Sequence, residues 1–426
     1  MTSEPAATDV AAQAPTASNE LVADSLSEYA AAQWKRIKAG ESGVLPVVVG
    51  LIIIVIAFQT QNSKFLTATN LNNLIQQCGV FVLLGMAESF ALLLGEIDLS
   101  TGFVMGIGAT VTAELNAAPH NVNWFLAALA GLAVCAVWGT IQGLLISRLG
   151  LPSFVVTLAG LLGGEGFLLY LVQKDKHAPG GSIAVTSNVL NDIDQGSMSN
   201  STGWIVMIVA VAVFAAYALL QHRRRSASSL VTPPLSLTAL KVAGVAAAGV
   251  VLVLISNHNR GSLLVHLSGV LWIVPFLAVV LIVYTVMLGK TRFGRYMYAI
   301  GGNPEAARRA GIRVKNVRTL AFTLSSFTAG LAGLVYLSQL GSIGSDIDGG
   351  NYVLYAVAAA VIGGTSLFGG RGRMSYALLG GLVITTIYNG MGLIQIGAAG
   401  QDMVIAVVLL AAVTVDAVSH RGRIGR

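Results

Sequence analysis

Charge is scarce in this chain, and its scarcity decides the class of protein. Only 10% of the 426 residues are Asp, Glu, Lys or Arg, where about a quarter is usual in soluble domains, and 55% are hydrophobic. No polar segment after the first 42 residues is long enough to form a soluble domain of its own. This excludes a separate soluble domain, so the function must reside in a membrane bundle and its loops.

Cysteine and proline are also few. The two cysteines, Cys78 and Cys135, both fall inside apolar runs, which argues against a structural disulfide and leaves the redox compartment undetermined. The ten prolines accompany 49 glycines that follow no Gly-x-y period, which excludes collagen. Such glycines suit membrane helices that approach one another closely.

The signatures of a catalytic, metal or nucleotide site are missing. Gly289-Lys290-Thr291 resembles the end of a phosphate loop, but Tyr284 stands where that loop requires glycine. No histidine is followed directly by a glutamate, which excludes the His-Glu-x-x-His metal helix. The segment 364–368 lacks the last glycine of a nucleophile elbow. These absences argue against an intramembrane enzyme and predict that the chain itself binds no cofactor or metal.

Twelve apolar runs are present along the chain. Each is near the length that spans a bilayer, roughly 17 to 25 residues, or somewhat shorter where glycine breaks a helix. They predict an all-α integral membrane protein, a polytopic helical bundle of about 12 transmembrane helices. The runs are 43–59, 72–95, 101–116, 124–147, 152–172, 203–220, 239–256, 270–288, 319–340, 352–368, 375–396 and 403–418.

Positive charge predicts the orientation of these runs. With the N-terminus inside, the Lys and Arg left outside, of 25 in all, are Lys64, Lys174, Lys176 and Arg260. Cytoplasmic loops carry the excess of cations, so we expect both termini in the cytoplasm and no nucleic-acid partner for the net charge of +6. The expected parts are a partly disordered cytoplasmic tail at 1–42, a transmembrane domain at 43–418 with a cytoplasmic loop at 289–318, and a basic tail at 419–426.

The most basic segment, 290–318, contains one short capped helix. Asn303 suits the N-cap, Pro304 the first helical position, and Gly311 the position after the end. So short a helix is unstable alone, and we expect it to dock on lipid headgroups or on a cytoplasmic partner. Its residues are Asn303, Pro304, Glu305, Ala306, Ala307, Arg308, Arg309 and Gly311.

Ionisable residues in the apolar runs mark a second candidate site. Between two runs, Gly95–Ser100 predicts a helix broken at the membrane edge, with Asp98 as N-cap of the next span rather than a ligand contact. Glu96 would point the other way, toward a pathway or the headgroups. Glu165 lies deeper, which predicts a polar cavity or a neutral carboxyl. The candidates for the pathway or the helix break are Glu96, Asp98, Ser100, Glu165 and Asn389.

Taken together, these segments resemble the permease subunits of ribose- and xylose-type ABC sugar importers. The matching segments, in order within 43–418, are 95–100, 152–154, 291–296, 301–308, 363–372 and 389–391. The resemblance implies a type II ABC importer permease in a bacterial cell membrane, with the helix after Asn303 as the coupling helix. It also implies a permease homodimer with the path at its interface, two cassettes that bind ATP and Mg²⁺, and an extracytoplasmic sugar-binding protein.

Two features distinguish this chain within the family. The extra apolar pair near 203–256, around Arg223–Arg225, resembles the longer xylose-type members, which also tend to have Glu at the position of Glu96. The family more often has Arg or Gln where Glu165 stands, so the sugar cannot be carried over directly. We expect a permease for a monosaccharide, with a pentose such as xylose as first candidate, that couples ATP hydrolysis by its partners to alternating access.

An ion-coupled sugar transporter is the alternative. Twelve spans with both termini inside suit that class, but it would need half-helices in two repeated halves or a set of proton-relay carboxylates. The sequence of the second half shows no copy of the break at Gly95–Ser100. The sequence therefore favours the ATP-driven importer.

Overall fold

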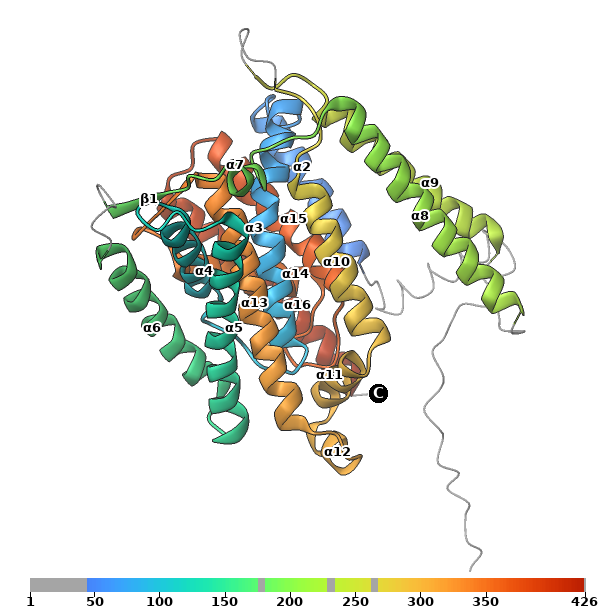
Figure 1. Ribbon diagram of the computed structural model, residues 1–426. Helices are drawn as coiled ribbons and strands as arrows, with labels where there is room; N and C mark the ends of the chain where they lie inside the picture. The colour runs from blue at the N-terminus through green and yellow to red at the C-terminus, as the bar shows by residue number, and fades with distance from the viewer. Residues whose placement is uncertain (1–43, 175–180, 228–233, 262–266, 425–426) are drawn as a thin grey trace, which may run out of the picture. The chain divides into compact units, whose positions relative to one another are not determined.

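The computed structural model describes residues 44–174, 181–227, 234–261 and 267–424, and nearly all of these are helical (Figure 1). Each of the twelve apolar runs corresponds to one helix, which confirms the polytopic all-α bundle. The twelve are α2 (Leu45–Gln61), α3 (Ala68–Leu92), α4 (Thr101–Asn116), α5 (Trp124–Arg148), α6 (Ser153–Lys174), α8 (Asn200–Ala227), α9 (Leu235–Ser256), α10 (Ile273–Lys290), α13 (Val314–Leu340), α14 (Gly349–Gly363), α15 (Met374–Leu393) and α16 (Ala398–Ile424).

Eight of these helices, α3, α5, α6, α8, α9, α10, α13 and α15, are long and apolar enough to cross a membrane. Helices α2 and α14 and the first part of α16 are shorter apolar helices, and α4 has only 16 residues. A 16-residue helix rises about 24 Å, less than the roughly 30 Å of a hydrocarbon core. The number of complete crossings therefore stays a prediction.

The remaining elements are short. They are α7 (Asn188–Asp192), α11 (Arg292–Gly302), α12 (Pro304–Arg309), β1 (Ser182–Ala184) and β2 (Ser342–Gly344). The two strands pair antiparallel, with Ile183 opposite Ile343. They join the loop after α6 to the loop after α13, both of which the charge pattern assigns to the outer side.

Helix α13 is central to the bundle and packs on α3, α4 and α5. Small residues make these contacts close. A β-carbon at Gly333 would overlap the carbonyl oxygen of Met105, and one at Gly139 would overlap that of Phe322. Because apolar surface alone does not drive helices together in lipid, this backbone-level packing accounts for the association of the helices.

Two four-helix segments repeat one packing pattern. In the first segment, α4 contacts α6, and both α4 and α5 pack on α13. In the second segment, α14 contacts α16, and both α14 and α15 pack on α3. Helix α3 ends where α13 begins, since Glu96, just after α3, pairs with Arg318 near the start of α13. The segments α3–α6 and α13–α16 therefore run in opposite directions and form an inverted repeat.

The expectation that the second half holds no copy of the helix break is wrong. In the inverted repeat, the connection between α3 and α4 corresponds to 341–348, between α13 and α14. The tripeptide Glu96-Ile97-Asp98 precedes α4, and Asp346-Ile347-Asp348 precedes α14. The two tripeptides lie at opposite ends of the bundle. They correspond to each other only because the two four-helix segments run in opposite directions.

The segment 205–251, with most of α8 and α9, forms a compact unit distinct from the rest of the chain. Among its described residues only Leu237 is buried, and the others are exposed or half-buried. The two helices touch where Gly249 approaches Met207. This is the additional pair that was predicted around Arg223–Arg225. Helices that are apolar on all sides require lipid or a partner to cover them.

Candidate functional site

The capped helix in the basic segment has the predicted geometry. The side chain of Asn303 accepts the N–H of Ala306 at 3.0 Å, and Gly311 has a φ of 82°, in the left-handed region that favours glycine. Glu305 pairs with Arg308 at 2.9 Å and with Arg309 at 3.4 Å. The caps are therefore confirmed. That this is the coupling helix stays a prediction.

Helix α12 is exposed for docking. Ala307 is its only buried residue, and its two arginines and Glu305 are exposed. Figure 1 shows α12 projecting at the end of the bundle where α11 and α13 meet. A six-residue helix presented in this way can bind a partner without any change in the membrane core.

Helix α11, just before α12, is joined to the bundle through glycine backbones. A β-carbon at Gly301 would overlap the carbonyl oxygen of Leu93, at the end of α3, and the amide of Gly370. The N–H of Gly370 donates to the carbonyl of Leu93 at 2.9 Å, and the Tyr298 hydroxyl donates to the carbonyl of Gly372 at 2.8 Å. Three segments far apart in sequence thus meet at the C-terminal end of α3.

The helix break is tied to α13 by an ion pair. The carboxylate of Glu96 lies 2.8 Å from the guanidinium of Arg318, and their side chains are 13% and 27% exposed. Arg318 lies in the first turns of α13, shortly after α12. The pair therefore connects the start of α13, the helix that follows the capped helix, to the break. Nothing in the local sequence pattern indicated that Arg318 is the partner of Glu96.

Asp98 is not the N-cap of α4, contrary to the sequence prediction. Ser100 occupies that position, and its side chain makes no capping bond. The Asp98 carboxylate points into the bundle, where it accepts the N–H and hydroxyl of Ser100 at 3.1 and 2.7 Å and the Ser325 hydroxyl at 2.8 Å. Two further fully or nearly buried groups complete the network: Glu88 accepts the Asp98 N–H at 3.2 Å, and Gln142 lies 3.0 Å from the Ser100 hydroxyl.

The network lets α13 hold the break at two points. Arg318 and Ser325 are seven residues apart, two helical turns, and so lie on one face of α13. One binds Glu96 and the other binds Asp98. A rotation or shift of α13 therefore cannot leave the break in place without breaking one of these contacts.

The other two candidates lie elsewhere. Glu165 is exposed on α6 in the single chain, and the expectation of a polar cavity or a neutral carboxyl at this position stays a prediction. Asn389 is buried on α15, where it accepts from the Asn70 amide at 2.8 Å and donates to Gln77 at 3.2 Å. It joins α15 to α3. The structure does not bring Glu165 or Asn389 together with the network around Asp98.

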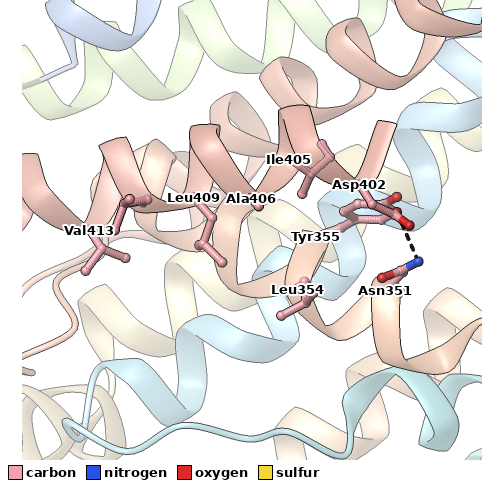
Figure 2. A pocket seen from close by; sticks show the side chains of 9 residues that line it. Asn351, Leu354, Tyr355, Asp402, Ile405, Ala406, Leu409 and Val413 are labelled. Atoms are coloured by element: carbon pink, nitrogen blue, oxygen red, sulfur yellow. Dashed lines mark hydrogen bonds between the residues drawn. The ribbon is translucent and has the colours of Figure 1, made fainter. Parts of the chain in front are cut away.

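A cavity of about 350 Å³ opens between α14 and α16 (Figure 2). Its polar end is formed by Asn351, whose amide donates to the Asp402 carboxylate at 3.3 Å, and by Tyr355. Figure 2 shows Leu409 and Val413 farther along α16, where the lining is apolar. The volume is at the lower end for ligand sites. Among the lining residues, polar partners for a ligand lie only at the end formed by Asn351, Tyr355 and Asp402.

One more carboxyl is buried, in the loop between α7 and α8. Asp194 is fully buried, its N–H donates to the Ser338 hydroxyl at 2.9 Å, and its carboxylate oxygens have no hydrogen-bond partner among the described residues. Burial raises the pKa of Asp194 to about 8. The loop is thus built around a carboxyl that is neutral at moderate pH.

This burial predicts a pH dependence of stability. Between its ordinary pKa, near 4, and about 8, the folded protein holds a proton that the unfolded chain releases, so stability falls as pH rises through that window and levels off above it. Asp194→Asn should flatten the fall and be more stable than wild type above pH 8. Thermal unfolding in detergent from pH 5 to 9 measures this. The control is Asp192→Asn, at an exposed position, and equal profiles for all three proteins would contradict the prediction.

Comparisons with known proteins agree with these features. The family model described as branched-chain amino acid transport system / permease component matches residues 70–413. The xylose transport system permease protein XylH of Escherichia coli (strain K12) is 32% identical over 381 residues, which cover 89% of this chain and 92% of the relative.

Two other relatives from the same strain are similar over most of their length. The D-allose transport system permease protein AlsC is 31% identical, covering 86% of this chain and 89% of the relative. The ribose import permease protein RbsC is 27% identical, covering 86% and 92%. No solved structure matches the chain. The chain therefore belongs to the family of branched-chain amino acid transport system permease components, and within it to the ABC sugar importer permeases of the xylose, ribose and allose type.

Proposed function

We propose that this chain is the membrane subunit of an ATP-driven monosaccharide importer, with a pentose such as xylose as first candidate substrate. Two copies would assemble with two cytoplasmic ATP-binding cassettes and receive sugar from an extracytoplasmic binding protein. The chain would lie in a bacterial plasma membrane in contact with lipid, with both termini and the loop 289–318 inside. ATP and Mg²⁺ would bind the cassettes and not this chain.

The observation that carries the proposal is the exposed, capped α12 at the start of α13. A helix of six residues needs a docking partner, and a cassette surface is one that can move. Movement of α12 would displace α13, which holds the break through Arg318 and Ser325. ATP-driven closure of the cassettes would in this way reach the connection between α3 and α4.

One observation favours an ion-coupled sugar transporter as second candidate. Inverted repeats with interrupted helices are common in secondary transporters, and here two carboxyl groups, Glu88 and Asp98, are buried beside the break. The relatives, named as transport system and import permeases, and the exposed α12 favour the ATP-driven importer.

Uptake into proteoliposomes separates the two candidates. The chain is reconstituted with its cassette and binding protein and assayed with radiolabelled xylose, ribose and allose, and with leucine as a control suggested by the family description. We expect uptake of a sugar that requires ATP and is lost with a cassette unable to hydrolyse it. Uptake without ATP that follows an imposed proton gradient would instead establish the ion-coupled transporter.

A further inference from the structure

The inverted repeat relates the start of α3 to the start of α13. Arg318, which pairs with Glu96, is the fifth residue of α13, and Asn72 is the fifth residue of α3. The two helices also begin with one sequence pattern, Asn-Leu/Val-x-x-Leu, at 70–74 and 316–320. Asn72 therefore occupies, at the opposite end of the bundle, the place that Arg318 occupies beside the helix break.

A guanidinium stands at this second place as well. Arg260, in the loop after α9, donates to the side-chain oxygen of Asn72 at 2.8 Å. It also donates to the carbonyls of Ser256 and Gly269, at 3.4 and 3.2 Å. Asn72 is fully buried, and Arg260 is half-buried and forms no ion pair within the described part of the chain. The cation is thus fixed to α3 without a carboxylate beside it.

The repeat assigns a carboxylate to this guanidinium. Glu96 is the first residue of the tripeptide before α4, and Asp346 is the first residue of the tripeptide before α14. Asp346 is exposed, and none of the described Lys and Arg residues forms an ion pair with it. One end of the bundle therefore holds a closed ion pair, whereas the equivalent cation and anion at the other end are apart.

The two ends also differ in the second contact that holds the break. Asp98 turns into the bundle, where Ser325, two turns after Arg318, donates its hydroxyl at 2.8 Å. The residue two turns after Asn72 is Gly79, which has no side chain to offer. The second contact therefore has no equivalent on α3.

The last residue of the second tripeptide agrees with this difference. Asp348 is the N-cap of α14, and its carboxylate accepts the Asn351 N–H at 3.2 Å. Asp348 thus serves its own helix, while its equivalent Asp98 binds another helix. The connection before α14 can be held to α3 at one point, Asp346, where the connection before α4 is held to α13 at two.

We propose that Arg260 and Asp346 form an ion pair when the end of the bundle at the start of α14 closes. We call them the outer pair, and Glu96 with Arg318 the inner pair, after the sides that the charge pattern assigns. The proposal rests on the proposed alternating access and names the contact that closes the second end. Alternating access in inverted repeats is largely a rocking of one repeat against the other, so equivalent contacts are made in opposite states. Since the inner pair is made here, the other state makes the outer pair and opens the inner one.

Disulfide crosslinking tests whether the two pairs alternate. Cysteines replace both residues of the outer pair in one importer and both residues of the inner pair in another, and the two native cysteines are buried. The complete importer is oxidised in membranes, without nucleotide and with ATP bound to a cassette that cannot hydrolyse it. Crosslinked peptides are quantified by mass spectrometry. We expect the outer crosslink to rise by about threefold or more in the state in which the inner crosslink falls.

Lys64→Cys combined with Asp346→Cys is the matched control for the outer pair. Lys64 is another cation just before α3, and it is exposed. An outer pair that never crosslinks above this control, or that crosslinks in the same state as the inner pair, would overturn the proposal.

Exchange of charge tests the pair by another readout. Asp346→Arg places two cations at the proposed contact and should reduce sugar uptake by about fivefold or more. Arg260→Glu in the same chain should restore uptake, whereas Lys64→Glu should not. Folded yield is measured for each variant, because Arg260→Glu gives up the hydrogen bonds to Asn72. Normal uptake by Asp346→Arg alone would contradict the pair even if Arg260→Glu does not fold.

Failure of this proposal is distinguishable from failure of the importer assignment. If ATP opens the inner pair and the outer pair does not close, the importer stands and the outer pair is wrong. If ATP changes neither pair, the importer assignment fails. The exchange of charge then decides the outer pair, because uptake can be measured with either energy source.

Discussion

Reversing the charge at either end of the Glu96–Arg318 pair is expected to uncouple ATP hydrolysis from sugar uptake, and reversing both is expected to restore coupling. Each single change, Glu96→Arg or Arg318→Glu, places two like charges about 3 Å apart in a largely enclosed site. Breaking a fully buried pair costs about 3 to 5 kcal/mol, and the cost here is lower because Arg318 is partly exposed. α13 should then separate from the break while the rest of the bundle stays folded.

The measurements are sugar transported per ATP hydrolysed and the yield of folded permease on size exclusion. Lys315→Glu, at an exposed position one turn before Arg318, is the control for a change of charge alone. If the exchanged pair, Glu96→Arg with Arg318→Glu, does not fit the site, a neutral pair is used instead. The double variant Glu96→Gln with Arg318→Gln should then transport better than either single charge reversal. Single reversals that transport normally would contradict the role assigned to the pair.

Asp98→Leu is expected to abolish folded protein, whereas Asp98→Asn should fold and retain most transport. Leucine leaves the Ser100 N–H and the Ser325 hydroxyl without the acceptor they have in a fully buried site, at about 1 to 3 kcal/mol for each unsatisfied donor, while the Ser100 hydroxyl keeps Gln142. Asparagine keeps one oxygen for Ser100, and its amide can donate to the Ser325 hydroxyl, which also accepts.

Folded yield and thermal unfolding of these variants decide the point. Ser325→Ala, which removes one partner and leaves the acceptor for Ser100, should lose less stability than Asp98→Leu. If Asp98→Asn is stable but does not transport, the charge itself acts in transport, and Asp98 is more than a structural acceptor. A stable Asp98→Leu protein would contradict the network.

The features that depend on neighbouring residues in the sequence, namely the helices and the caps of α12, could be predicted. The twelve apolar runs each correspond to a helix, because a span of apolar residues in a bilayer has few alternatives to a helix. The caps of α12 were also predicted, since Asn303 and Gly311 act within three or four residues of their own position. Neither prediction depends on where other helices lie.

The contacts of the candidate site could not be predicted in this way. Asn70 and Asn389, and Asp98 and Ser325, are more than two hundred residues apart, and only helix packing brings them together. The N-cap prediction for Asp98 was wrong because its carboxylate points into the bundle, where one of its oxygens binds Ser325 on another helix. The depth of Glu165 along its helix could be read from the sequence, but the direction in which its face of α6 points could not.

The glycine contacts at the end of α3 have a mechanical consequence. Side chains can absorb a small displacement by changing rotamer, but Gly301, Gly370 and the carbonyl of Leu93 meet backbone to backbone and have no side chain to adjust. The joint between α11 and the membrane helices therefore cannot yield by a change of rotamer. A displacement of α11 therefore acts directly on the backbone at the end of α3 and on the segment around Gly370.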